Sequence, residues 1–449
     1  MRILFQTFCL GLALLLVTVQ HAAAQGMNLL RDAEIEGTLR TFATPIFKTA
    51  GLDPQAVRIY IINDPTLNSF VAGGQNLFMN TGTILRSSSP NQIIGVMAHE
   101  TGHIAGGHLA RSTQAMKNAM IESIIGMVLG GAATVAGHGN AGPGGLMAGM
   151  SVGQRSFTQF SITQEASADQ AGLRFLDRTH QSARGLLEFF QILQQEEFLS
   201  AQRQDPYLQT HPLTDERVNY VREHVLHSPY GDTKDPPEWL ALNAIMKAKL
   251  NAFLNAPSQT LGQLKPDDNS EPARYARAIA YYRIPDLKNA LPIIDGLIKD
   301  FPNNPFYNEL KGQMLFENGR VAEAVAPYER AVQISPNEPL LNIEAAQVQL
   351  ETNDPKMVPK AMTELNNALR IESDNGEAWR FLAVAHGRSG NIGMAALSLA
   401  EQNMANGNYK QASIESVRAQ KLLPPGPQRQ RAQDIQGDAK RNLDQQNSQ

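Results

Sequence analysis

The sequence predicts an α+β chain that is mainly helical, in which a domain with a small sheet precedes an all-α solenoid. Three observations predict this fold class. Short segments of alternating apolar residues lie between residues 57 and 80, Ala-rich helical stretches follow them, and from about residue 271 a pattern recurs every 34 residues. The chain has 449 residues, of which 42% are hydrophobic and 18% charged, so we expect at least two domains.

The amino terminus has the pattern of a cleavable signal peptide. Arg2 precedes an apolar run from Leu10 to Val19, and alanines at residues 22–24 provide a cleavage site, so we expect residues 1–24 to be removed on export. The one cysteine, Cys9, lies in this segment, and a mature chain without thiols fits the bacterial periplasm. A net charge of −4 gives no indication of nucleic-acid binding, and none is expected.

The first part of the mature chain is expected to contain the sheet. Residues 57–62, 68–72 and 77–80 have the composition and alternation of strands, and Gly73-Gly74 predicts a tight turn between the last two. An exposed edge of such a sheet binds an extended peptide as an additional strand.

The motif His99-Glu100-Thr101-Gly102-His103 carries the strongest chemical indication in the sequence. Pro90 and the apolar residues after it predict a helix that runs into the motif. Positions four apart share a helix face, so His99 and His103 are placed to bind one Zn²⁺, with Glu100 as the general base for a metal-bound water. This chemistry is peptide hydrolysis; the alternative is that both histidines only line a core or surface helix.

A catalytic zinc needs a third protein ligand. Glu165 begins an Ala-rich helical stretch and Asp169 follows one turn later, which suits Glu165 as the ligand and Asp169 as the acceptor that orients a liganding histidine. The alternative is a solvated helix face. His108 is a rival donor, but five residues after His103 it would point well around the helix, so we take it as supporting or structural.

These motifs, followed by Thr210-His211-Pro212 and Arg217, resemble the zinc metallopeptidases that include HtpX and the CAAX prenyl-protein proteases, and among them the BepA-type periplasmic branch. The resemblance implies a zincin-like (gluzincin) metallopeptidase domain with one zinc ion per chain. It implies that Glu165 completes the zinc site and that Asp169 supports it from behind. It also implies that His211 lies near the metal, where it occupies the fourth position and holds the enzyme inactive.

Two of these residues have simpler interpretations. His211 and Pro212 are also consistent with a turn before a helix that begins near Thr214. Arg217 is a candidate to stabilise the oxyanion of the reaction, to pair with an acidic group behind the metal ligands, or to lie on the surface.

Residues 120–153 are rich in Gly, Ala and Met. Glu122 and the Gly-Pro interruption at 142–143 shorten the apolar run below the roughly 20 residues that a membrane span needs. We expect a mobile lid or hairpin over the site, a buried helical hairpin, or a peripheral contact with a membrane surface.

The second domain is expected to be a solenoid of tetratricopeptide repeats. Ala290 and Ala324, and Pro302 and Pro336, are each 34 residues apart, which is the period of this repeat. We expect a metallopeptidase domain over residues 25–265, repeats over 270–423, and a flexible polar tail over 424–449.

The sequence therefore predicts a periplasmic zinc endopeptidase whose repeats bind substrates or a partner. The resemblance implies that the substrates are unfolded or misassembled outer-membrane proteins, which the enzyme degrades when they are misfolded or stalled. It also implies that the repeats contact the outer-membrane assembly machinery. The alternative is a chaperone or assembly factor for these proteins, with a latent zinc site closed by His211.

Overall fold

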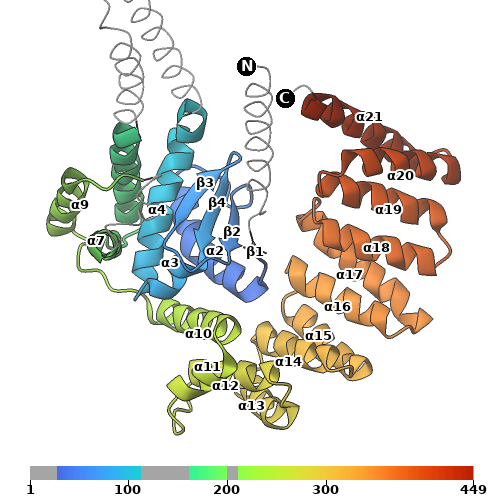
Figure 1. The fold of residues 1–449 in the computed structure, drawn as a ribbon, viewed down its shortest axis with the longest axis horizontal. Coiled ribbons are helices and arrows are strands. Elements are labelled where there is room, and N and C mark those ends of the chain that lie inside the picture. The colour runs from blue at the N-terminus through green and yellow to red at the C-terminus, as the bar shows by residue number, and fades with distance from the viewer. Residues whose placement is uncertain (1–27, 113–160, 200–210, 448–449) are drawn as a thin grey trace, which may run out of the picture. The chain divides into compact units, whose positions relative to one another are not determined.

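The computed structural model describes residues 28–112, 161–199 and 211–447, which form two units (Figure 1). The first unit contains residues up to 31 and residues 39–236, and the second contains residues 32–38 and the chain from 237 onward. The expected signal peptide and the Gly- and Met-rich segment 120–153 lie outside the described residues. None of the described helices is long and apolar enough to cross a membrane.

The first unit contains a four-stranded sheet in the order β1-β2-β4-β3, and the three longer strands lie where the sequence predicts them. β2 is parallel to β4, whereas β1 pairs antiparallel with β2 and β3 pairs antiparallel with β4. The strands are β1 (Leu29–Leu30), β2 (Arg58–Ile62), β3 (Ser69–Ala72) and β4 (Asn76–Asn80). β3 is therefore an edge strand, and it contacts the helix that carries the His-Glu-x-x-His motif.

The other regular elements described in the first unit are helices. They are α2 (Ala33–Thr49), whose first residues group with the second unit, α3 (Thr81–Arg86), α4 (Pro90–Gly106), a helical stretch over residues 161–178, α7 (Arg184–Leu199) and α9 (Asp215–His227). α4 begins where Ser89 accepts a hydrogen bond from the Gln92 amide and Pro90 occupies the first turn. α4 packs against α7, and most of its residues are buried.

α4 and the helical stretch 161–178 approach each other unusually closely. A Cβ atom added to Gly102 would lie 2.6 Å from the carbonyl oxygen of Ala168, and one added to Gly172 would lie 3.1 Å from that of Ala98. Only glycine permits this backbone separation. The two helices therefore bring the His-Glu-x-x-His motif and the Glu165–Asp169 segment face to face.

The second unit is helical. Its elements are α10 (Pro237–Leu254), α11 (Pro257–Gln263), α12 (Glu271–Arg283), α13 (Leu287–Asp300), α14 (Pro305–Glu317), α15 (Val321–Ile334), α16 (Pro339–Glu351), η1 (Pro355–Met357), α17 (Val358–Ile371), α18 (Gly376–Arg388), α19 (Ile392–Ala405), α20 (Tyr409–Leu422) and α21 (Pro427–Asn447). α14 and α16 begin 34 residues apart, whereas α18 begins 37 residues after α16. The three-residue helix η1 accounts for the longer repeat. The expected solenoid of helix pairs is confirmed.

The boundary between the domains differs from the expected one near residue 265. α10 and α11 group with the repeats, because Ile245 and Ala252 of α10 pack with Tyr275 and Ile279 of α12. The contacts of α10 thus assign it to the solenoid, although its sequence lacks the repeat pattern.

The expectation of a flexible tail over residues 424–449 needs correction. α21 spans most of this segment, and Ala432, Ile435 and Ala439 form an apolar stripe that packs in one cluster with Ala412 of α20. Arg431 adds a bidentate ion pair to Glu401, with N–O distances of 2.6 and 2.8 Å. The polar composition concealed a narrow stripe at helical spacing, and that stripe is sufficient to dock the helix.

Buried charges occur in the second unit. Lys249 Nζ lies 2.8 Å from Asp32 Oδ2 and 3.2 Å from Glu34 Oε2, and all three belong to this unit. Gln349 donates to Glu364 Oε1 (3.1 Å), while the other oxygen of Glu364 has no hydrogen-bond partner among the described residues.

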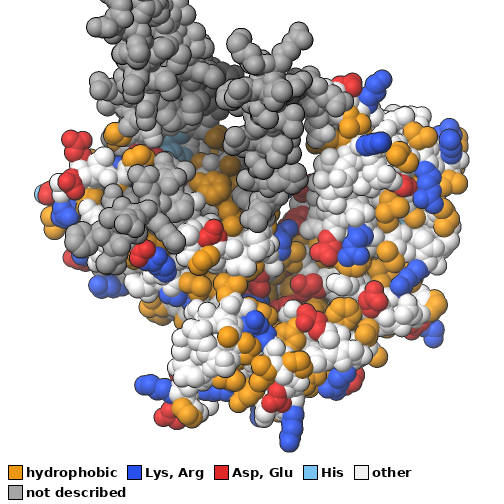
Figure 2. All heavy atoms as spheres, viewed as in Figure 1, with side chains coloured by type: hydrophobic (Ala, Val, Ile, Leu, Met, Phe, Trp, Pro, Cys, Tyr) orange, Lys and Arg blue, Asp and Glu red, His pale blue; other side chains and the backbone are white. Residues whose placement is uncertain are grey.

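On the face in Figure 2, the described surface of the repeats shows acidic and basic side chains interspersed.

Candidate metal centre

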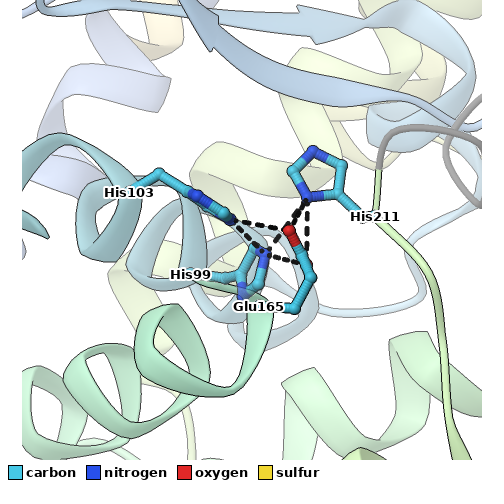
Figure 3. A group of neighbouring side chains, drawn as sticks. All are labelled: His99, His103, Glu165 and His211. Carbon is cyan, nitrogen blue, oxygen red and sulfur yellow. Dashed lines mark hydrogen bonds and ion pairs between the residues drawn. The ribbon is translucent and has the colours of Figure 1, made fainter. Parts of the chain in front are cut away.

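Four buried side chains from three parts of the chain converge in the first unit (Figure 3). α4 supplies His99 and His103, the helical stretch 161–178 supplies Glu165, and the segment before α9 supplies His211. One ligand atom from each lies within 4.8 Å of the other three. The structure thus brings together the histidines of the motif, the predicted third ligand and the histidine implied by the resemblance.

The spacing of these atoms suits a four-coordinate ion. His99 Nε2 lies 3.1 Å from His103 Nε2 and 3.5 Å from His211 Nδ1. The Glu165 oxygens lie 3.3 Å from each of His99 Nε2 and His103 Nε2, and 3.1 Å from His211 Nδ1. Ligands about 2.0–2.1 Å from a tetrahedral zinc are separated by about 3.3 Å from one another. The three-nitrogen, one-carboxylate set therefore fits zinc in both chemistry and dimensions.

Asp169 lies directly behind His99. Its Oδ1 atom is 2.8 Å from His99 Nδ1, so the carboxylate accepts a hydrogen bond from the Nδ1–H group. The Nε2 atom of His99 is then directed toward the other donors. Both residues are fully buried. This is the arrangement expected for an acceptor that orients a liganding histidine.

Arg217 contacts the acidic groups of the centre. Its Nε donates to Asp169 Oδ2 (2.6 Å), and its Nη1 lies 3.0 Å from Glu165 Oε2. The guanidinium also donates to the carbonyl of Pro212 (2.7 Å) and lies over the ring of Phe190. Of the roles considered for Arg217, the geometry favours pairing with acidic groups over contact with a reacting oxyanion.

Glu100 is fully buried, and neither carboxylate oxygen has a hydrogen-bond partner among the described residues. His211 Nε2 lies 3.7 Å from its Oε1 atom. Burial raises the pKa of Glu100, although the charges of His211 and His99 oppose the shift. A buried carboxyl group without hydrogen bonds, placed beside a metal-binding cluster, has the environment of a general base.

In the absence of a metal, the pKa values of the donor side chains are shifted in different directions. Burial lowers the pKa of His103 to about 3, so its imidazole is neutral. Burial also acts to lower the pKa of His99, but hydrogen bonds to Asp169 and Glu165 outweigh it and raise that pKa to about 10. The neighbouring histidines hold the pKa of Glu165 well below its usual range in spite of burial. The centre is thus built to hold positive charge.

Two supports of the centre agree with the sequence analysis, one of them only in kind. His108 was expected to be supporting or structural but to point away from His103; instead it contacts the rear nitrogen of His103, because α4 ends at Gly106 and the chain turns before residue 108. The helix expected to begin near Thr214 does so, and Thr214 caps α9 by accepting a hydrogen bond from the amide of Arg217. The glycine inside the motif, Gly102, carried a signal that was overlooked, since a small residue on a buried helix face often marks a close helix contact.

Comparisons with known proteins agree with this arrangement. Residues 30–225 match Peptidase family M48, and residues 275–339 match Tetratricopeptide repeat. The first match contains every residue of the candidate centre, and the second lies within the helical second unit.

Similar proteins carry protease names. The beta-barrel assembly-enhancing protease of Yersinia pestis is 22% identical over 388 residues, which cover 86% of this chain and 79% of that protein. The putative beta-barrel assembly-enhancing protease of Vibrio cholerae is 29% identical over 257 residues, or 55% of this chain and 52% of that protein. Metalloprotease LoiP of Escherichia coli is 24% identical over 195 residues, covering 43% of this chain and 72% of its own length.

These findings confirm the resemblance and the enzyme class predicted from the sequence: the chain is a metallopeptidase in which residues 30–225 match Peptidase family M48 and residues 275–339 match Tetratricopeptide repeat.

Proposed function

We propose that this chain is a zinc-dependent metalloendopeptidase of the periplasm that degrades misfolded or stalled outer-membrane proteins, with repeats that bind substrates or the outer-membrane assembly machinery. The observation that carries the proposal is the buried set of three histidines and one carboxylate, with Glu100 beside it. The predicted signal peptide supports the compartment. The names of the similar proteins, which refer to β-barrel assembly, support the substrate class.

Each residue of the centre has a proposed role. His99, His103 and Glu165 hold one zinc ion, and Asp169 orients His99. Zinc bound there would polarise both the attacking water and the carbonyl of the scissile peptide bond. Glu100 accepts the proton of the water and passes it to the leaving amine, since its oxygens make no competing hydrogen bond among the described residues.

The proposed holder of the substrate is the edge strand β3. It is four residues long, it pairs only with β4 among the described residues, and it contacts α4. A peptide that pairs with β3 would be held extended beside the helix that carries the centre. Backbone pairing of this kind suits unfolded chains of varied sequence, because it depends little on side chains.

A Glu100→Gln variant tests the mechanism. The amide retains the size of the carboxylate but cannot accept the proton, so zinc content should remain at one per chain while cleavage of an unfolded β-barrel protein is lost. Glu196→Gln is the matched control, since Glu196 pairs with Arg86 on the surface. Cleavage retained in the Glu100 variant would refute the assigned base.

A second candidate function has its own supporting observation. His211 Nδ1 lies where a fourth zinc ligand would, 3.1 Å from Glu165 Oε1 and 3.5 Å from His99 Nε2. A zinc site with four protein ligands has no position for water and resembles a structural site. The chain would then act as a chaperone or assembly factor for outer-membrane proteins until a client displaces His211. Suppression of β-barrel protein aggregation by the Glu100→Gln variant would support this function.

A further inference from the structure

His108 lies behind His103, on the side away from the other donors. α4 ends at Gly106, and Gly107 adopts a left-handed conformation (φ 62°) that turns the chain. The turn brings His108 Nδ1 to within 3.0 Å of His103 Nδ1, with the two rings edge to face. His108 is only 3% exposed, so this contact is screened from water.

Other residues hold His108 in this place. Gln164, which immediately precedes the proposed ligand Glu165, donates to the carbonyl oxygen of His108 (3.3 Å), and Ser112 donates to the side-chain oxygen of Gln164 (2.8 Å). The His108 ring lies directly against Gly106, where an added Cβ would be 2.4 Å from its Nε2. The position of the ring therefore depends on a glycine at residue 106.

The contact bears on which nitrogen of His103 carries the proton when Nε2 binds a metal. A neutral imidazole has one N–H, and His103 Nε2 faces His99 Nε2 (3.1 Å) and Glu165 Oε1 (3.3 Å). If Nε2 is to bind a metal, the proton must be on Nδ1, and that N–H needs an acceptor in a buried place. The nitrogen of His108 is within hydrogen-bond distance.

We propose that His108 is a positioning residue that accepts the Nδ1–H of His103 and so presents the Nε2 lone pair of His103 to the metal. The inference rests on the proposed zinc site. The acceptor behind His99 is the carboxylate of Asp169, whereas the proposed acceptor behind His103 is the neutral imidazole of His108. His108 therefore orients the His103 ring without adding a further buried charge.

The zinc affinity of the full chain tests the proposal, measured by competition with a chromophoric chelator. His108→Leu removes the acceptor and should weaken zinc binding by about 10–100-fold. His108→Asn places its side-chain oxygen near the position of Nδ1 and should bind zinc within about threefold of the native chain. His224→Leu is the control, since His224 pairs with Asp177 outside the centre.

A backbone variant tests the same contact without altering the histidine. Gly106→Ala should push the His108 ring off His103 and weaken zinc binding in the same direction as His108→Leu. Native zinc affinity in His108→Leu, or equal losses of affinity in the Asn and Leu variants, would overturn the proposal. Either result would mean that zinc affinity does not depend on a hydrogen-bond acceptor at residue 108.

Nitrogen NMR of the metal-free chain with ¹⁵N-labelled histidine provides a readout that needs no variant. The proposal predicts that His103 carries its proton on Nδ1, and a proton on Nε2 would overturn it. This measurement separates the two claims. A native chain that binds no zinc would refute the proposed function, while the NMR result would still decide the role of His108.

Discussion

Gly102→Ala tests whether the close approach of two helices sets the metal centre. The added Cβ would lie 2.6 Å from the carbonyl oxygen of Ala168, whereas ordinary contacts begin near 3.4 Å, so the helices must separate by about 0.8 Å. Glu165 and Asp169 are on the helix that moves, and metal sites tolerate about 0.2 Å in ligand distance. The separation should therefore reach the zinc ligands.

The magnitude follows from the cost of overpacking, about 1–3 kcal/mol. If zinc binding requires the helices to move back together, the free energy of zinc binding becomes less favourable by this amount. That corresponds to a loss of roughly 5–150-fold in zinc affinity. Zinc titration and thermal unfolding of the metal-free chain measure how the cost divides between binding and stability. Gly37→Ala on α2 is the control, since its added Cβ would meet no atom of a described residue within 4 Å beyond the helix itself. Native zinc affinity and native stability in Gly102→Ala would refute the reasoning.

Three further predictions concern the buried charges and the proposed zinc lock. Lys249→Met leaves Asp32 and Glu34 without their cation and should lower the free energy of unfolding by about 3–5 kcal/mol in denaturant titrations; a loss below 1 kcal/mol would contradict the importance of this ion pair. Burial raises the pKa of Glu364 to about 7 from an ordinary value of 4.5, so its contribution to stability is present below pH 4.5 and is lost as the pH rises through 7. Glu364→Gln should therefore leave stability unchanged at pH 4 and raise it by at most about 3 kcal/mol at pH 8, and a gain of equal size at both pH values would argue against the shift. His211→Ala should increase basal cleavage of an unfolded protein several-fold by opening the fourth zinc position, whereas unchanged or lost cleavage would count against the lock.

The sequence predicted those parts of the structure that depend on local periodicity. The helix of the His-Glu-x-x-His motif, the three longer strands and the repeat spacing of 34 residues all follow from patterns within a short window. The pairing of Glu165 and Asp169 was also readable, because residues one turn apart share a helix face. Each of these inferences needed only the period of a helix, a strand or a repeat.

Most of the features that were missed depend on contacts between distant segments. α10 joins the repeats through Ile245 and Ala252, and nothing in its own sequence indicates which domain it packs against. α21 docks through three small or apolar residues that its polar composition concealed. The direction of His108 was wrong for a local reason, because a regular helix does not continue past Gly106: Gly107 adopts a left-handed conformation and ends α4. The packing partners of α10 and α21, in contrast, are set by tertiary contacts.

The metal content of the purified chain tests the central claim most directly. Elemental analysis combined with X-ray absorption at the zinc edge would report both the amount of metal and the atoms around it. The account predicts one zinc per chain, held at about 2.0–2.1 Å by His99, His103 and Glu165, with His211 or a water in the fourth position. A chain without zinc, or zinc surrounded mainly by water oxygens, would contradict it.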